Sequence, residues 1–323
     1  MGMTNEPRTL IEAVRHFADP EVTHELIVSL RWPTGVHCPT CGRTDVRFIA
    51  TRRLWECKEQ HPRRQFSAKV GTIFEDSPLS LDKWFVAIWA VANCKNGISS
   101  YELARALGVQ QRSAWFMLHR IRLAMKAGSL EKLAGDVEAD ETFVGGLSKN
   151  MHKVKREEII KKRRGPAGKT VVMGILERSE KKKKKSSKVR ARVAQNVKGD
   201  TLRSNVRENV EPGATLHTDA WIGYRGLDAE YVHHVIDHTV EYVNGKIHTN
   251  GIENFWSLLK RTVKGTYVSV EPFHLEAYVD EQVFRFNERD DSDHGRFRKV
   301  LRAVFGRRIT YAELTGHAAP TTA

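Results

Sequence analysis

The stretch GDVEADETFVGG, residues 135–146, alternates apolar and polar side chains in the way that a half-buried β-strand does. Two more strand patterns follow: KTVVMGILER (169–178) is a continuous apolar run suited to a central strand, and KVRARVAQNV (188–197) alternates basic with apolar residues. The next three patterns are a helix and two strands: DTLRSNVRENV (200–210), ATLHTDAW (214–221) and YVHHVID (231–237). This order predicts an α/β fold with a mixed five-stranded sheet and flanking helices.

Two helix patterns complete this region, at 248–261 and 271–289. In HTNGIENFWSLLKR (248–261), five apolar residues form one side: Ile252, Phe255, Trp256, Leu258 and Leu259. A helix turns by about 100° per residue, so Glu253 and Lys260, seven positions apart, share another face. Asn250 is suited to be the N-cap. The polar face is either a solvated stripe opposite the core or part of a functional site.

Two aspartates occupy comparable places, Asp140 within the first strand pattern and Asp219 at the end of the fourth. Successive residues of a strand point to opposite faces, so Asp140 and Glu141 cannot both serve one site. A buried carboxylate needs a counter-ion, and a divalent cation is the simplest one. Salt bridges to basic residues are the alternative, and Asp219 could also be a helix N-cap. With Glu253, the two aspartates would offer three oxygen ligands, which favour Mg²⁺ or Mn²⁺ over zinc.

Upstream, three of the four cysteines lie in one short region, as CPTC (38–41) and CKEQH (57–61). A Cys-x2-Cys pair followed by a Cys-x3-His pair can supply a tetrahedral Zn²⁺ site, and the flanking residues resemble the short strands of a zinc ribbon. The predicted ligands are Cys38, Cys41, Cys57 and His61. His37 is an alternative histidine because it precedes Cys38, and a redox Cys-x-x-Cys is an alternative function.

Between the ribbon and the sheet, residues 99–125 have the spacing of a helix-turn-helix, with Gly108 at the turn. The second helix would present four side chains to a major groove: Gln110, Gln111, Arg112 and Trp115. The basic residues His119, Arg120 and Arg122 accompany them and favour DNA contact. Many helical hairpins share this spacing without binding DNA.

The formal net charge of +14 is concentrated in one segment. Residues 149–198 hold 19 Lys and Arg against 4 Asp and Glu, which leaves the rest of the chain near neutral. Such a segment favours a polyanionic partner such as DNA, and a solubilising loop is the alternative. The chain of 323 residues has no run of 18 apolar residues and no secretory signal pattern, so we expect an intracellular protein. A DNA partner would place it in the cytoplasm, associated with the nucleoid.

Several motifs together resemble a known family: CPTC, WECKEQH (55–61), RRQFSAKVGTIFEDSPLSLDKWF (63–85), EADETFVGG (138–146), HTDAWIGY (217–224) and HTNGIENFWSLLKRTVKGTY (248–267). They are similar to motifs of the bacterial zinc-ribbon insertion-sequence transposases, within the DDE transposases and retroviral integrases that have an RNase H-like fold. The resemblance covers residues from about 20 to 290. It implies that Asp140, Asp219 and Glu253 are the catalytic ligands of two Mg²⁺ or Mn²⁺ ions.

The third ligand has two candidates. In the resembled family this position is often an Asn followed by a Lys, and the sequence offers Asn250 as well as Glu253 ahead of Lys260. Asn254 lies about 120° from Lys260 around the helix, which argues against it. A carboxylate neutralises more metal charge than an amide, so Glu253 is the predicted ligand and Asn250 a supporting or substitute ligand.

The resemblance also implies an activity and its partners. The protein would bind the terminal inverted repeats of a mobile element, cleave DNA strands there and join them to target DNA. Lys260 and Arg261 would hold phosphates near the ions, and two DNA ends imply a dimer or larger assembly; neither a membrane nor a small-molecule substrate is implied. Two alternatives remain: a structure-specific endonuclease or ribonuclease on the same fold, and a transcription regulator whose third domain is inert.

Four segments follow from these patterns. They are an N-terminal segment with the zinc ribbon (1–76), a helix-turn-helix domain (77–130), an RNase H-like catalytic domain with a basic insertion loop (131–290), and a C-terminal tail (291–323).

Overall fold

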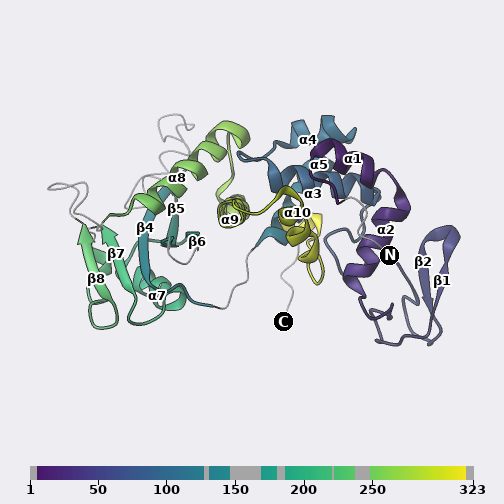
Figure 1. Ribbon diagram of the computed structural model, residues 1–323, viewed down its shortest axis with the longest axis horizontal. Coiled ribbons are helices and arrows are strands. Elements are labelled where there is room, and N and C mark those ends of the chain that lie inside the picture. Colours follow the sequence, from purple (N-terminus) through teal and green to yellow (C-terminus); the bar gives the residue numbers. More distant parts are fainter. Residues whose placement is uncertain are drawn as a thin grey trace. The chain divides into compact units, whose positions relative to one another are not determined.

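The computed structural model describes residues 6–126, 131–145, 169–179, 186–219, 222–236 and 248–317 (Figure 1). The chain forms two compact units. The ribbon unit comprises Met1–Met125 with Asp291–Ala323, and the sheet unit comprises Lys126–Asp290. The finer division into four segments stays a prediction. No helix in the described ranges is long and apolar enough to cross a membrane.

The sheet unit contains the mixed five-stranded sheet that the sequence predicts. Its strands are β4 (Asp136–Val144), β5 (Thr170–Glu177), β6 (Lys188–Ala194), β7 (Thr215–Asp219) and β8 (Val232–Ile236). Their order across the sheet is β6-β5-β4-β7-β8. The pairs β4–β5 and β5–β6 are antiparallel, whereas β4–β7 and β7–β8 are parallel. The lysine-rich runs at 161–164 and 181–185 lie outside the described residues.

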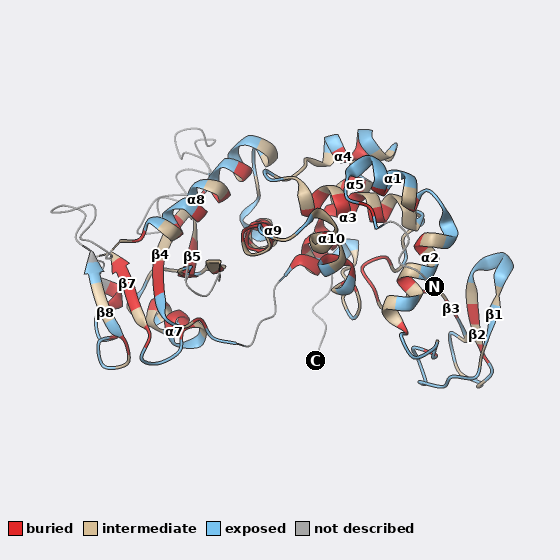
Figure 2. Ribbon diagram, viewed as in Figure 1, coloured by how far each residue is buried: buried red, intermediate tan, exposed pale blue. Residues whose placement is uncertain are grey.

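Helices cover both faces of this sheet because its strands alternate apolar residues on the two sides. On one face, α7 (Gly199–Asn209) packs through Leu202 and Val206 against apolar residues of β4 and β5. On the other face lie α8 (Asn250–Thr262) and α9 (Leu275–Asn287). In Figure 2 the buried residues run along β4, β5 and β7, which is where the two layers meet the sheet.

In the ribbon unit, three short antiparallel strands form the predicted ribbon: β1 (Val46–Ile49), β2 (Leu54–Cys57) and β3 (Gln65–Phe66). Two helices precede them, α1 (Leu10–Phe17) and α2 (Pro20–Arg31). The small sheet is rich in rings: Trp55 stacks on His24 at a centroid distance of 5.4 Å and meets Trp32 edge-on at 5.3 Å. These contacts give the ribbon an apolar core of its own.

The helical part of the ribbon unit contains α3 (Leu81–Asn93), α4 (Ser100–Leu107), α5 (Gln111–Met125), α10 (Asp293–Arg302) and α11 (Tyr311–Leu314). A capping box at Ser99 begins α4, and Gly108, at φ +62°, ends it. The predicted helical hairpin is therefore present, with Ala114, Met117 and Ile121 buried along α5. The packing of this hairpin does not by itself imply contact with DNA.

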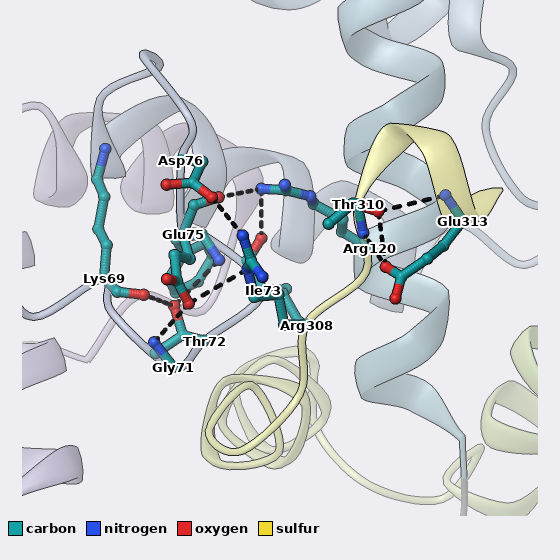
Figure 3. Close-up of polar contacts among 11 residues, drawn as sticks. Lys69, Gly71, Thr72, Ile73, Glu75, Asp76, Arg120, Arg308, Thr310 and Glu313 are labelled. Carbon is teal, nitrogen blue, oxygen red and sulfur yellow. Dashed lines mark hydrogen bonds and ion pairs between the residues drawn. The ribbon is translucent and has the colours of Figure 1, made fainter. Parts of the chain in front are cut away.

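Three basic side chains that favoured DNA contact are buried instead. His119, Arg120 and Arg122 are at most 4% exposed, so they cannot serve as groove contacts on the surface of α5. Arg120 donates to the carbonyl oxygens of Ile73 and Glu75, at 2.9 and 2.7 Å (Figure 3). Its guanidinium holds the loop that precedes α3, because buried carbonyl groups need hydrogen-bond donors.

The same loop is held from the C-terminal side of the unit. Arg308 forms ion pairs with Glu75 at 3.4 Å and with Asp76 at 2.6 Å (Figure 3). Glu75 in turn accepts from the backbone N–H of Gly71, at 2.8 Å. Residues more than two hundred positions apart thus fix one turn, and the C-terminal segment belongs structurally to the ribbon unit.

Candidate active site

The sheet brings Asp140 and Asp219 to neighbouring strands on one face. β4 and β7 are parallel, with Glu138 paired to His217, and each aspartate lies two residues further along its strand. A step of two residues keeps a side chain on the same face, and neighbouring strands lie about 4.8 Å apart. Both aspartates therefore face the α8 layer, Asp140 from the middle of β4 and Asp219 from the last residue of β7.

Helix α8 is attached to β4 at its first turn by Glu138, which is only 1% exposed. One carboxylate oxygen of Glu138 accepts from the backbone N–H of Ile252 at 2.8 Å, and the other accepts from Arg178 at 2.6 Å. Arg178 also donates to the carbonyl oxygen of His248. The helix N-terminus, which has unsatisfied N–H groups, thus receives a buried negative charge from the strand.

A second attachment lies one turn further along α8. The indole Nε1 of Trp256 donates to a carboxylate oxygen of Asp140, at 2.9 Å. Gly174 of β5 is paired with Asp140 and leaves the room for the indole, because a Cβ there would lie 2.5 Å from the Trp256 ring. Neither Trp256 nor Gly174 was predicted to belong to the site. A glycine inside a strand pattern is a signal of such close approach.

Substituting Gly174 by Ala is expected to destabilise the sheet unit by about 1–3 kcal/mol, because overpacking forces a buried ring to move. The displaced indole would also release Asp140. Urea unfolding measures the first effect. Gly265→Ala, with no atom within 4 Å of the added Cβ, is the matched control and should unfold like the wild type. Equal midpoints for all three proteins would contradict the close approach.

Glu253 reaches the same place from α8. Its side chain is exposed and accepts from the Thr249 hydroxyl at 3.0 Å. Thr249 is the N-cap and Asn250 the first helical residue, so the prediction that Asn250 caps the helix is wrong. The Glu138 carboxylate bonds the first turn in place of a capping side chain. Asn250 itself is exposed on that first turn.

The three acids act on one another. Burial, with smaller contributions from the charges of Asp219 and Glu253, raises the pKa of the Asp140 carboxyl to about 6, although hydrogen bonds from the Glu141 backbone N–H and from Trp256 lower it. Three acids held together on a partly buried surface repel one another. A divalent cation would remove that repulsion and use the oxygen ligands that Mg²⁺ and Mn²⁺ prefer.

A fourth acid lies behind the sheet. Glu141 points to the α7 face, as expected, where it accepts from the hydroxyl of Tyr224. Burial raises the pKa of the Glu141 carboxyl to about 8, with contributions from the charges of Asp140 and Asp219. The sequence patterns assigned no site role to Glu141 and did not point to Tyr224. Tyr224 does stand in the motif HTDAWIGY, only five residues after Asp219.

Glu141 should make the stability of the protein depend on pH. Its folded pKa of about 8 lies above its ordinary 4.5, so the unfolded chain loses the proton first and the free energy of unfolding falls between these pH values. Glu141→Gln removes this effect. We expect the variant and the wild type to melt alike at pH 4 and the variant to melt several degrees higher at pH 8. Glu211→Gln, at an exposed position, is the control. If the melting temperatures of the two variants depended on pH in the same way, this result would contradict the burial of Glu141.

The last turn of α8 carries Lys260 and Arg261, and both are exposed. Two turns of helix separate Lys260 from Glu253 along one face, as expected from their spacing. Cations near a helix C-terminus are stabilised by its partial negative charge. Both side chains are thus available to an anionic ligand.

In the ribbon unit, the four predicted groove residues differ in their surroundings. Gln110 and Arg112 are exposed. Gln111 donates to the Ser100 hydroxyl at 2.8 Å, and the ring of Trp115 meets that of His119 at 4.5 Å. Gln110 and Arg112 are therefore the freer side chains of this set.

The zinc site is assembled as predicted. One ligand atom from each of Cys38, Cys41, Cys57 and His61 lies within 4.8 Å of the others. The ring Nδ1 of His61 contacts the carbonyl oxygen of Pro62 at 2.7 Å, so Nδ1 carries the proton and Nε2 is left for the metal. Burial raises the pKa of the Cys38 thiol, but the amide N–H groups of Cys41 and Thr40 offset this and lower it to about 7. These features fit structural Zn²⁺ and favour His61 over His37.

Comparisons with known proteins agree with both units. Residues 132–287 match the ISXO2-like transposase domain, and residues 19–60 match the transposase zinc-ribbon domain. The chain is also 24% identical, over 256 residues, to an uncharacterized protein in transposable element ISH50 of Halobacterium salinarum. That alignment covers 77% of this chain and 84% of the relative.

Proposed function

Since the chain belongs, through both matched domains, to the insertion-sequence transposases with a zinc ribbon, we propose that it binds the terminal inverted repeats of its element, then cleaves and joins DNA strands there. One observation supports the chemistry most directly. Asp140, Asp219 and Glu253 come from two strands and a helix, and the charges of Asp219 and Glu253 both raise the pKa of the Asp140 carboxyl.

We propose Asp140, Asp219 and Glu253 as the ligands of two Mg²⁺ or Mn²⁺ ions. The donor set fits: these are hard oxygen ligands, and the charged groups that act most strongly on Asp140 are the other two acids. Bound cations would lower the pKa of the attacking water and neutralise charge on the scissile phosphate. Trp256 would fix the orientation of Asp140, and Glu138 would fix the start of the helix that carries Glu253.

The remaining side chains would hold DNA. Lys260 and Arg261 are exposed on the helix of Glu253 and would bind phosphates next to the scissile bond. In the ribbon unit, Gln110 and Arg112 would contact the terminal repeat, with Gln111 and Trp115 on the same surface. Asn250 would support the Glu253 ligand. Joining requires two ends, so the active species would be a dimer or a larger assembly.

Incubation of the full-length protein with labelled element ends, a target plasmid and Mg²⁺ tests this proposal. We expect labelled ends covalently joined to plasmid. More joined product with Mn²⁺ than with Mg²⁺ would also agree with the proposal. Cleavage without joining would support an endonuclease instead. Metal-independent binding without cleavage would support a DNA-binding regulator.

A further inference from the structure

The segment that follows α8 contains a strained turn at Val268. Helix α8 continues into a π-helical turn, Val263–Tyr267, and the chain then reverses toward α9 (Figure 1). Val268 has φ +61° and ψ −54°, and the N–H of Ser269 bonds to the carbonyl oxygen of Tyr267 at 2.6 Å. This is a γ-turn with positive φ, which is rare and strained for any residue. For a β-branched residue it is an outlier.

Buried groups hold this turn in place. The Tyr267 hydroxyl donates to Glu281 at 2.5 Å, and Glu281, which is 0% exposed, also accepts from Arg285. The rings of Tyr267 and Tyr278 meet edge-on at 4.6 Å. One turn earlier, the Thr262 hydroxyl bonds to Gln282 at 3.2 Å. Strain of this kind persists only where the surrounding structure over-determines the backbone, and such positions cluster at functional sites.

The strained turn exposes an apolar side chain among cations. Val268 is 77% exposed, and Phe273, five residues on, is 68% exposed. Lys260, Arg261 and Lys264 are exposed just before the turn. Glu271 is the only acid in residues 260–274. An apolar tip flanked by basic residues fits a ligand that is a polyanion outside and apolar inside. Duplex DNA has both properties, whereas a protein surface does not.

We propose that Val268 and Phe273, beyond the end of α8 opposite Glu253, form an apolar wedge that enters the DNA several base pairs from the scissile phosphate and unstacks a base there. This inference rests on the proposed function, because it takes the DNA end as the ligand of Lys260 on the same helix. Side chains that enter a base step are apolar and are held by contacts to the adjacent phosphates. The buried hydrogen bonds among Tyr267, Glu281 and Arg285 hold the turn, so that Val268 stays exposed while it displaces the base.

Fluorescence of 2-aminopurine, which increases when the base unstacks, tests the wedge. The probe is a duplex with the element's own terminal repeat, in which 2-aminopurine replaces one base at a time near the end. The protein is full-length Asp219→Asn, so that the DNA stays uncut. We expect a several-fold rise at one position several base pairs from the cleavage site and none at the other positions.

Val268→Gly separates a functional role from a structural one. Glycine adopts positive φ without strain, so this variant should melt at or above the wild-type temperature, yet lose most of the fluorescence rise and of the joining activity. Phe273→Ser should lower the rise with an unchanged melting temperature. Val235→Ser, at a valine of β8 that is 55% exposed, is the matched control and should keep the full rise.

Three results with the variants would overturn the wedge. The first is an undiminished rise in Val268→Gly and Phe273→Ser, and the second is an equal loss in Val235→Ser. The third is loss of self-association in Val268→Gly with normal fluorescence, which would assign the tip to a protein interface. Joining by the wild type without any fluorescence rise would reject the wedge alone. Absence of both binding and joining would reject the proposed function with it.

Discussion

Asp140→Asn, Asp219→Asn and Glu253→Gln are each expected to lower the rate of strand cleavage and joining by about 10³-fold or more. Each change removes a charged ligand, and a bound cation contributes several kcal/mol of charge stabilisation in the transition state, with about 1.4 kcal/mol per factor of ten. The substitutions keep size and shape, so DNA binding by the ribbon unit should be unchanged. Rates with labelled ends, together with a binding titration, measure both quantities.

Asn250→Ala is the matched control, because Asn250 lies on the same first turn of α8 and is exposed. It should retain far more activity than Glu253→Gln. The opposite order, with Glu253→Gln active and Asn250→Ala inactive, would move the third ligand to Asn250. The metal-free Asp140→Asn protein should also melt above the wild type at pH 8, since burial and two neighbouring acids oppose the charged form of Asp140.

Cys41→Ser is expected to release zinc and to unfold the ribbon. Structural zinc contributes about 10–16 kcal/mol to the folding of small zinc modules, far more than the three short strands could supply without it. Metal analysis should show less than one zinc per chain, and limited proteolysis should cut within residues 36–66. Binding to the terminal repeat should fall with it.

Cys94→Ser is the control for this change, because Cys94 lies outside the group of four ligand side chains. It should keep one zinc per chain and normal proteolysis. The sheet unit should retain its secondary structure in Cys41→Ser, since its core is separate. Full zinc content in Cys41→Ser would contradict the ligand set.

The sheet and the positions of its acids were predictable from local patterns. Period-2 alternation placed Asp140 and Glu141 on opposite faces, and the apolar run 169–178 gave a central strand. The Cys and His spacing gave the zinc ligands, because short loops force these side chains together. In each case the information lies within a few residues of the feature.

Contacts between distant segments were not predictable in this way. The basic residues of α5 favoured contact with DNA in the sequence. In the structure, Arg120 instead donates hydrogen bonds to carbonyl groups of a loop 45 to 47 residues earlier. The N-terminus of α8 is bonded by Glu138, 114 positions upstream, and not by Asn250. A side chain's charge is visible in the sequence, but its partner is fixed only by the fold.

Anomalous diffraction from crystals grown with Mn²⁺ would show where this protein binds divalent cations. We expect anomalous density within bonding distance of carboxylate oxygens of Asp140, Asp219 and Glu253, and its loss in crystals of Asp140→Asn. Density bonded to Asn250 in place of Glu253 would correct one ligand. Density elsewhere, with the three carboxylates bonded to protein side chains alone, would contradict the proposed catalytic metal site.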